Sequence, residues 1–162
     1  MPSKMTAQEE RNVKSVEDWA RAWETDAARM VDKVYADSTE VFVPLQGLYM
    51  VKTGKSKADW RAVEIANQKL YKMRKLTLAK VVPSEDKVAV EVLVTETNLI
   101  DRTRERWFSA FLRFDKDGRI VSDHTYQLHA EVTPDPARAH NDDIRAKMEA
   151  LRNAHQKIMA QQ

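Results

Sequence analysis

Four long segments in the second half of the chain alternate between apolar and polar residues, and they limit the possible folds more than any other feature. These segments cover residues 74–83, 87–99, 103–115 and 119–129, and short polar turns separate them. Consecutive strands joined by such short turns form an antiparallel meander. Strands this long exceed the usual length of about 5 to 6 residues and are typical of strongly twisted, curved sheets. A curved sheet needs other elements to cover its concave face.

The first half of the chain supplies helices for that cover. Apolar residues recur at helical intervals over 15–24, over a segment from Thr25 to Ser38, and over 56–72. Between the last two of these helices, residues 39–44 and 47–53 predict a short β-hairpin. We therefore predict an α+β fold in which three N-terminal helices pack on a curved antiparallel sheet and leave room for a cavity.

A polar start and a proline-containing break divide the chain into three parts. A chain of 162 residues fits a single domain. Residues 1–14 are polar and predict a flexible N-terminal tail, residues 15–133 form the predicted domain, and residues 134–162 form a C-terminal helical extension. The apolar positions of this last helix make a narrow seam of Ile144, Met148, Leu151, His155 and Ile158. Such a seam predicts packing on the domain or on a second copy of the chain.

Composition excludes several classes of function. The 27 Lys and Arg residues barely exceed the 25 Asp and Glu residues, and a net charge of +2 is too small to indicate nucleic acid or an anionic membrane as a partner. The absence of cysteine excludes disulfides, thiolate nucleophiles and cysteine-ligated metals. The start of the sequence lacks the apolar core of a signal peptide, and no segment approaches the ~18 apolar residues of a membrane span. We therefore expect a cytoplasmic protein that does not bind membranes.

Motifs for cofactors and metals are also missing. The sequence has no glycine-rich phosphate loop and no dinucleotide fingerprint. Its four histidines lack the spacing of a metal site. We therefore expect no cofactor and no metal. A basic surplus between residues 52 and 75 would suit an acidic partner, but such surpluses are typical of a solvated helix face.

Short motifs along the chain agree with the order of the same elements in a known superfamily. The segment Trp19–Asp26 followed by Val34–Asp37 resembles the opening helices of the nuclear transport factor 2-like superfamily. Val41–Pro44 with Gly54-Lys55 resembles its first hairpin, and Lys116–Val121 resembles the turn into its last strand. The resemblance extends to the SnoaL-like, polyketide cyclase-like branch of that superfamily.

This resemblance covers about residues 15–130 and implies a cone-shaped fold with a hydrophobic pocket between the helices and the concave face of the sheet. It also implies a homodimer built through the sheet. Members of the superfamily include polyketide cyclases, a ketosteroid isomerase, dehydratases, an epoxide hydrolase and binding proteins without enzymatic activity. The motifs indicate the fold, whereas the activity depends on the residues that line the pocket.

The last predicted strand carries the first candidate for a catalytic group. Alternation places Asp123 and Thr125 on one face of the strand and His124 and Tyr126 on the other. The resemblance implies that the carboxylate of this strand faces the pocket, so we assign Asp123 as the general base and Thr125 to the pocket wall. Burial among apolar side chains raises the pKa of a carboxyl group and makes it a better proton acceptor. If the register is shifted by one residue, His124 takes the place of Asp123.

Three further residues could assist Asp123. Glu96 ends an apolar row on its strand and lies either at the mouth of the pocket or beyond its edge. Arg106 could pair with Glu96 or Asp123, or orient an anionic or carbonyl oxygen of a substrate. Tyr35 carries a hydroxyl that could polarise a carbonyl, as tyrosines do in several relatives. The alternatives are a salt bridge at the rim of the sheet for Arg106 and a place in the core for Tyr35.

Aromatic residues from the helices and the sheet predict the walls of the pocket. The candidate ligand-binding residues besides Thr125 are Trp19, Trp23, Phe42, Trp60 and Phe108. Aromatic walls suit a flat or polycyclic apolar ligand, although aromatic stripes at helical spacing also form ordinary cores.

Two departures from the superfamily pattern narrow the activity. Several of its lyases use a His at the start of the strand after the third helix, and residues 71–76 contain none. Thr125 stands where the epoxide hydrolase has an inward acid. We therefore expect an isomerase, cyclase or dehydratase in which Asp123 moves a proton on an apolar, carbonyl-bearing small molecule. The alternative is a protein without activity that binds a ligand or acts as a dimeric interaction module.

Overall fold

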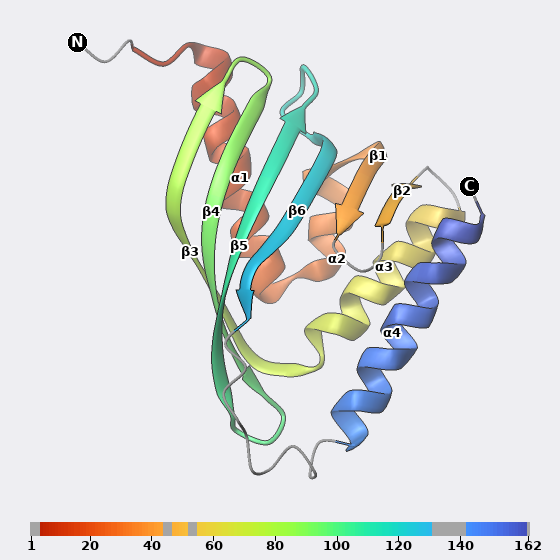
Figure 1. The fold of residues 1–162 in the computed structure, drawn as a ribbon. Helices are drawn as coiled ribbons and strands as arrows, with labels where there is room; N and C mark the ends of the chain where they lie inside the picture. The colour runs from red at the N-terminus through yellow and green to blue at the C-terminus, as the bar shows by residue number, and fades with distance from the viewer. Residues whose placement is uncertain (1–3, 44–46, 52–54, 131–141, 162) are drawn as a thin grey trace.

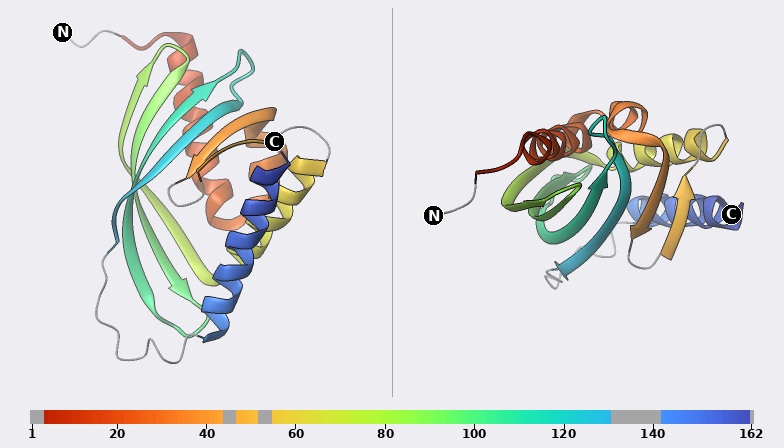
Figure 2. Two further views of the ribbon diagram at one scale, coloured as in Figure 1. Left: turned by 45° about the vertical axis from the view of Figure 1, so that its right-hand side comes forward. Right: turned by 90° about the horizontal axis from the view of Figure 1, so that it is seen from above.

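A curved sheet wraps around the N-terminal helices in the computed structural model, which describes residues 4–43, 47–51, 55–130 and 142–161 (Figure 1). The view from above shows how far the sheet curls around the space that the helices cover (Figure 2). The predicted α+β class with a curved sheet is confirmed. The predicted break at 134–136 lies outside the described residues.

The first helix, α1, covers Ala7–Thr25 and begins earlier than the sequence analysis predicts. The Thr6 side chain accepts a hydrogen bond from the Glu9 amide, and the Glu9 carboxylate accepts one from the Thr6 amide, which is a capping box. Asn12 is fully buried and its amide donates to the Glu85 carbonyl at 3.1 Å. The assignment of residues 1–14 to a flexible tail is therefore wrong from Ala7 onward. Ser15, where the sequence predicts the helix to begin, lies inside α1 and donates to the Gly118 carbonyl at 2.7 Å.

The second helical segment is short and ends in a π-helix. Asp26 caps α2 (Ala27–Arg29), where its carboxylate accepts from the Arg29 amide at 2.9 Å. The π-helix η1 follows over Met30–Val34, and the Tyr35 amide closes its turn by donating to the Met30 carbonyl. The helix therefore ends at Val34 rather than near Ser38, because Tyr35 already has the extended backbone of the first strand.

The sheet has six strands in the order β2-β1-β6-β5-β4-β3. Their bounds are β1 (Tyr35–Val43), β2 (Gly47–Val51), β3 (Tyr71–Ser84), β4 (Lys87–Asn98), β5 (Thr103–Phe114) and β6 (Ile120–Ala130). The predicted meander is confirmed, because β3 to β6 pair with their chain neighbours in antiparallel fashion. The predicted hairpin of β1 and β2 is also present. However, β1 runs parallel to β6, so the sheet is mixed rather than antiparallel throughout.

Two long helices complete the cover on the far side from α1. Helix α3 covers Lys55–Gln68, and helix α4, over Asp142–Ala160, lies beside it (Figures 1 and 2). Leu151, His155 and Ile158 of α4 are buried, whereas Met148 is 43% exposed. Within the described residues, the predicted seam of the last helix therefore packs on the domain itself. None of the helices in the described ranges combines the length and apolar character that crossing a membrane requires.

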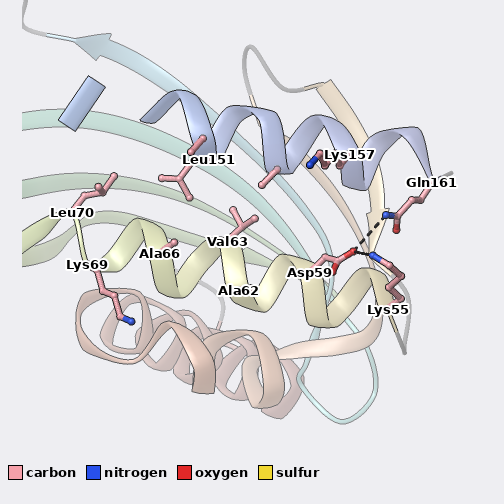
Figure 3. A pocket seen from close by; sticks show the side chains of 12 residues that line it. Lys55, Asp59, Ala62, Val63, Ala66, Lys69, Leu70, Leu151, Lys157 and Gln161 are labelled. Atoms are coloured by element: carbon pink, nitrogen blue, oxygen red, sulfur yellow. Dashed lines mark hydrogen bonds and ion pairs between the residues drawn. The ribbon is translucent and has the colours of Figure 1, made fainter. Parts of the chain in front are cut away.

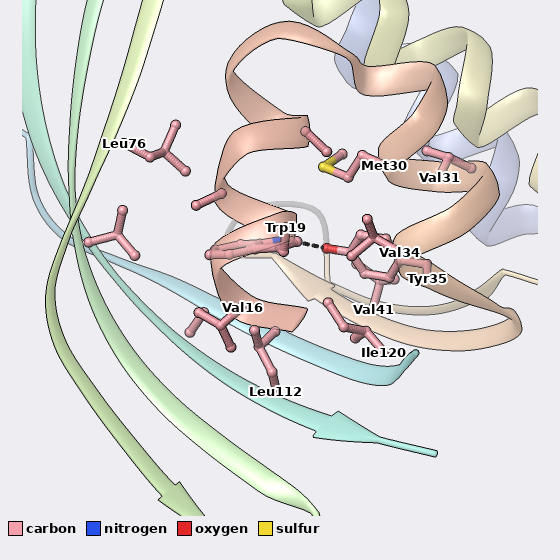
Figure 4. Close-up of a cluster of buried hydrophobic side chains, with 14 of the residues drawn as sticks. Val16, Trp19, Met30, Val31, Val34, Tyr35, Val41, Leu76, Leu112 and Ile120 are labelled. Atoms are coloured by element: carbon pink, nitrogen blue, oxygen red, sulfur yellow. Dashed lines mark hydrogen bonds between the residues drawn. The ribbon is translucent and has the colours of Figure 1, made fainter. Parts of the chain in front are cut away.

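The apolar core lies between α1, η1 and the concave face of the sheet. Val16 and Trp19 of α1 pack there in one buried cluster with Leu112 of β5 and Ile120 of β6 (Figure 4). Val31 of η1 belongs to the same cluster. Alternation along the strands brings their apolar residues to this face, and the helices exclude water from it. The core thereby fixes the helices over the concave face.

Candidate active site

A cavity of about 130 Å³ lies between the helices and the concave face of the sheet. The residues that line it are Trp19, Trp23, Met30, Tyr35, Val41, Trp60, Glu64, Asn67, Phe108, Asp123, Thr125 and His155. Enclosed cavities of about 150 Å³ hold a molecule the size of benzene. Of the flat or polycyclic ligands that the aromatic walls predict, a single flat ring matches this volume and a polycyclic ligand exceeds it.

Aromatic rings make up much of the cavity wall. The Trp23 and Phe108 rings meet at 77° with centroids 5.9 Å apart, and the Tyr35 and Trp60 rings meet at 83° with centroids 4.8 Å apart. Trp19 lies against Trp23, with a centroid distance of 5.4 Å. The Trp23–Phe108 and Tyr35–Trp60 contacts are favourable edge-to-face pairs, and the five rings together form an aromatic box.

Asp123 is the buried carboxyl group of this box. It lies on β6 with Thr125, both residues are less than 10% exposed, and both line the cavity. The Asp123 Oδ1 atom accepts from Thr125 Oγ1 at 2.6 Å, and Oδ2 accepts from the Tyr35 hydroxyl. Burial raises the pKa of the Asp123 carboxyl, although the hydrogen bonds from Thr125 and Tyr35 oppose this effect. Such a carboxyl group is a stronger base than an exposed one.

Tyr35 takes part in a chain of hydrogen bonds that fixes Asp123. The Trp19 Nε1 atom donates to the Tyr35 hydroxyl at 2.9 Å (Figure 4). That hydroxyl in turn donates its only proton to Asp123. Burial also raises the pKa of Tyr35 well above its usual range, so its proton stays in place. Tyr35 thus orients Asp123 in this structure, and polarising a substrate carbonyl would require this hydrogen bond to break.

His124 and Phe42 lie on the opposite face of the sheet. His124 Nε2 pairs with a carboxylate oxygen of Glu40, and the Phe42 ring contacts His124 and Tyr126 at centroid distances of 5.7 and 5.2 Å. Neither residue lines the cavity. The assignment of Phe42 to the ligand-binding wall is therefore wrong. The reason is strand parity, because Phe42 pairs with His124 across the parallel ladder and shares its face.

Glu96 and Arg106 form a separate charge cluster. Glu96 is fully buried and accepts from Arg74 Nε at 2.9 Å, from Arg106 Nη2 at 2.6 Å and, more distantly, from Arg104. Of the pairings that the sequence leaves open for Arg106, the structure contains the one with Glu96 and not the one with Asp123. Burial lowers the pKa of Arg106, and Glu96 opposes this effect.

The charge cluster lies behind the aromatic wall and does not line the cavity. The Arg106 guanidinium carbon is 5.0 Å from the Phe108 ring centroid, and that of Arg74 is 5.5 Å from the Trp23 ring centroid. These cation–π contacts join the cluster to two of the cavity rings. Glu96 and Arg106 therefore support the wall and would not contact a ligand in this cavity.

Two titratable residues of the cavity were missed by the sequence analysis. Glu64 Oε1 accepts from Trp60 Nε1 at 3.0 Å, and His155 Nε2 lies 4.0 Å from the same oxygen. Burial raises the pKa of Glu64, an effect that Arg74 opposes, and burial lowers the pKa of His155. The cavity thus contains two carboxyl groups and one imidazole.

A signal for Glu64 was present in the helical spacing. It lies four residues after Trp60 and three before Asn67, so it shares the apolar face of α3 that the sequence predicts. His155 lies in the seam of α4, but nothing local indicates that this helix closes the cavity. Only the packing of α4 on α3 brings His155 next to Glu64.

A second, larger hollow lies between α3 and α4 (Figure 3). It measures about 640 Å³, and alanines with Val63, Leu70 and Leu151 line most of it. At one end Lys55 pairs with Asp59 at 2.5 Å, and Gln161 lies 3.5 Å from the same carboxylate. Its walls present no buried acid or base among the described residues, so the smaller cavity is the candidate active site.

Within the described ranges, no three His, Asp or Glu residues come close enough together to hold a metal ion.

Comparisons with known proteins identify the fold. No model of a protein family matches the sequence, and no curated protein matches it. Among solved structures, a hypothetical protein with a ketosteroid isomerase-like fold from Catenulispora acidiphila, in complex with trimethylamine, is 18% identical with a TM-score of 0.58 over 70% of this chain and 84% of that one. A putative SnoaL-like polyketide cyclase from Jannaschia is 11% identical with a TM-score of 0.61 over 78% and 91%.

An NTF2-like protein from Anabaena variabilis is similar to the same extent, with 12% identity and a TM-score of 0.64 over 80% of this chain and 97% of that one. The chain therefore has the nuclear transport factor 2-like fold, which SnoaL-like and ketosteroid isomerase-like proteins share. At these identities the likeness shows the fold and selects no activity.

Proposed function

We propose that this protein is an acid–base enzyme of the isomerase, cyclase or dehydratase type, in which Asp123 moves a proton on a small, largely apolar substrate. The observation that carries the proposal is the position of Asp123, buried in an aromatic cavity with both carboxyl oxygens held by hydroxyl groups. A carboxyl group in such surroundings has a raised pKa and a fixed direction, which are the two properties that a general base needs.

The proposed reaction uses side chains of this chain alone. The Asp123 carboxylate takes a proton from a substrate carbon next to an activating group such as a carbonyl. In an isomerisation the protonated Asp123 then returns this proton to another carbon. Tyr35 and Thr125 hold the carboxyl group in place throughout and are positioning residues.

Proton exchange at the α-carbon of a small ketone tests this proposal. Cyclopentanone has six heavy atoms and matches a cavity of about 130 Å³. The wild-type protein should accelerate the incorporation of deuterium from D2O, followed by proton NMR, and Asp123→Asn should lower this rate by about 10²- to 10⁴-fold. Asp117→Asn makes the same change in an exposed turn and should have no effect. Equal rates for Asp123→Asn and the wild type would refute the assignment.

A dimeric arrangement is supported by a different observation. The convex face of the sheet carries an aromatic patch, defined here as Phe42, Phe111 and Tyr126, of which Phe111 is 55% and Tyr126 38% exposed. Exposed aromatic groups of this kind are enriched in protein interfaces. We propose that two copies of the chain pair through this patch, whether the cavity is catalytic or only binds a ligand.

A further inference from the structure

Four hydrogen-bond donors of the cavity wall are already used within the protein. The donor–acceptor pairs are Trp19 to Tyr35, Tyr35 to Asp123, Thr125 to Asp123 and Trp60 to Glu64. These residues therefore offer a ligand the faces of their rings and the remaining lone pairs of the Asp123 and Glu64 carboxyl groups. These four donors are not available to a developing oxyanion, whereas a positive charge finds several acceptors in the two carboxyl groups.

The charges of the cavity also favour a positively charged ligand. Asp123 and Glu64 both line it, and neither Lys nor Arg does so among the described residues. The imidazole of His155 is kept in its neutral form at neutral pH, because burial lowers its pKa. Arg74 and Arg106 lie behind the Trp23 and Phe108 rings, where Glu96 neutralises part of their charge.

The shape of the aromatic wall fits a compact cation. Five aromatic residues line the cavity, and two pairs of their rings meet at 77° and 83°. Rings arranged at right angles around a space are the arrangement that holds ammonium groups through cation–π contacts, which strengthen when water is excluded. A volume of about 130 Å³ limits the ligand to a small molecule.

We propose that the cavity binds a small organic cation of the ammonium or iminium type, with its charge between Asp123 and Glu64 and against the indole rings. This inference rests on the proposed function and names the substrate class for it. The positive charge of an iminium substrate acidifies the neighbouring C–H bond more strongly than a neutral carbonyl does. In an iminium substrate, Asp123 takes the proton, the C–H electron pair forms a C=C bond, and the C=N π pair becomes a lone pair on nitrogen.

Binding of such a cation should depend on pH through the groups that face the two carboxyls. Tyr35, Thr125 and His124 act on Asp123, and Arg74, Trp60, Asn67, His155 and Asp123 act on Glu64. Burial raises the pKa of both carboxyls, so protons compete with the cation at acidic pH. Protonation of His155 at low pH adds a positive charge and acts in the same direction. Affinity should therefore increase as the pH rises.

Two isosteric compounds test the inference. Tetramethylammonium and tert-butanol have the same number of heavy atoms and differ in charge, and isothermal titration calorimetry measures the binding of each to the full-length protein. Tetramethylammonium should bind at least tenfold more tightly than tert-butanol at pH 8, and this ratio should decrease at pH 5. Asp123→Asn and Glu64→Gln should each lower the ratio at pH 8 by about tenfold and leave the binding of tert-butanol unchanged.

Glu17 on α1 provides a matched control. Glu17→Gln removes one negative charge from the exposed face of α1 and should preserve the ratio. Retained binding of tert-butanol shows that each variant keeps its folded cavity. Equal affinities for the two compounds in the wild-type protein would overturn the inference, even if Asp123 still catalyses deuterium exchange. Conversely, a preference for the cation without any Asp123-dependent exchange would overturn the proposed function and leave the cation site.

Discussion

Asp123 shows how opposing effects on a single residue produce a usable base. Its two hydroxyl donors, Tyr35 and Thr125, favour the carboxylate, whereas removal from water favours the neutral acid. Burial is the larger effect, so the pKa of Asp123 is raised. The hydrogen bonds therefore serve mainly to fix the direction of the carboxyl group. Glu64 is affected by burial in the same direction.

The raised pKa of Asp123 predicts how stability changes with pH. The folded state holds the Asp123 proton more tightly than the unfolded chain does. The contribution of this difference to the free energy of unfolding is fully present below the ordinary pKa of 3.8 and is lost as the pH rises through the raised pKa. Over that interval Asp123 decreases the free energy of unfolding by up to about 1.4 kcal/mol per pH unit. Asp123→Asn should make the decrease shallower by this amount, as measured by urea unfolding between pH 4 and pH 8. Identical slopes for the variant and the wild type would contradict the raised pKa.

At the scale of the elements, the site depends on helices that the meander does not specify. The π-helix η1 contributes Met30 to the cavity and connects directly to Tyr35, the residue that orients Asp123. Short π-helices are often found at functional sites. Helix α4 contributes His155, and it does so because Leu151 and Ile158 on the same face are buried.

The packing of α4 can be tested at one position of its seam. Ile158 is fully buried, and Ile158→Ala should destabilise the protein by about 2 to 5 kcal/mol, because it removes apolar contacts and leaves a cavity. Met148→Ala changes a 43% exposed residue of the same helix and should cost much less. Urea unfolding of both variants measures the difference. Equal small effects would mean that α4 does not pack on α3 in solution.

At the scale of the whole molecule, the two faces of the sheet have different chemistry. The concave face carries the core and the cavity, and the convex face carries the aromatic patch of Phe42, Phe111 and Tyr126. A large apolar group in water is unfavourable, and pairing of two convex faces would remove this patch from water. The two faces can therefore bind different partners without competing.

The proposed dimer predicts the effect of a charge on the convex face. The wild-type protein should elute as a dimer in size-exclusion chromatography with light scattering, and Phe111→Asp should convert it to a monomer, because a buried unpaired carboxylate is costly. Met73→Asp places the same charge at a 41% exposed residue of β3 and should leave the dimer intact. A monomeric wild type, or a dimer that persists in Phe111→Asp, would refute pairing through this patch.

The sequence by itself determined the strands of the meander and the face of β6 that carries Asp123. Both follow from local physics, because side chains alternate along a strand and short polar turns join antiparallel neighbours. The helical spacing of α3 also contained the information that places Glu64 beside Trp60. The start of α1 could equally have been predicted from the capping box of Thr6 and Glu9.

Only the tertiary structure decided which distant elements meet. The parallel pairing of β1 with β6 turns Phe42 away from the cavity, and neither segment contains a local signal for that direction. The packing of α4 on α3 brings His155 to Glu64, and the approach of β3, β4 and β5 places Arg74, Arg104 and Arg106 around Glu96. Such contacts depend on the packing of the whole chain, because each joins segments whose local patterns are compatible with several arrangements.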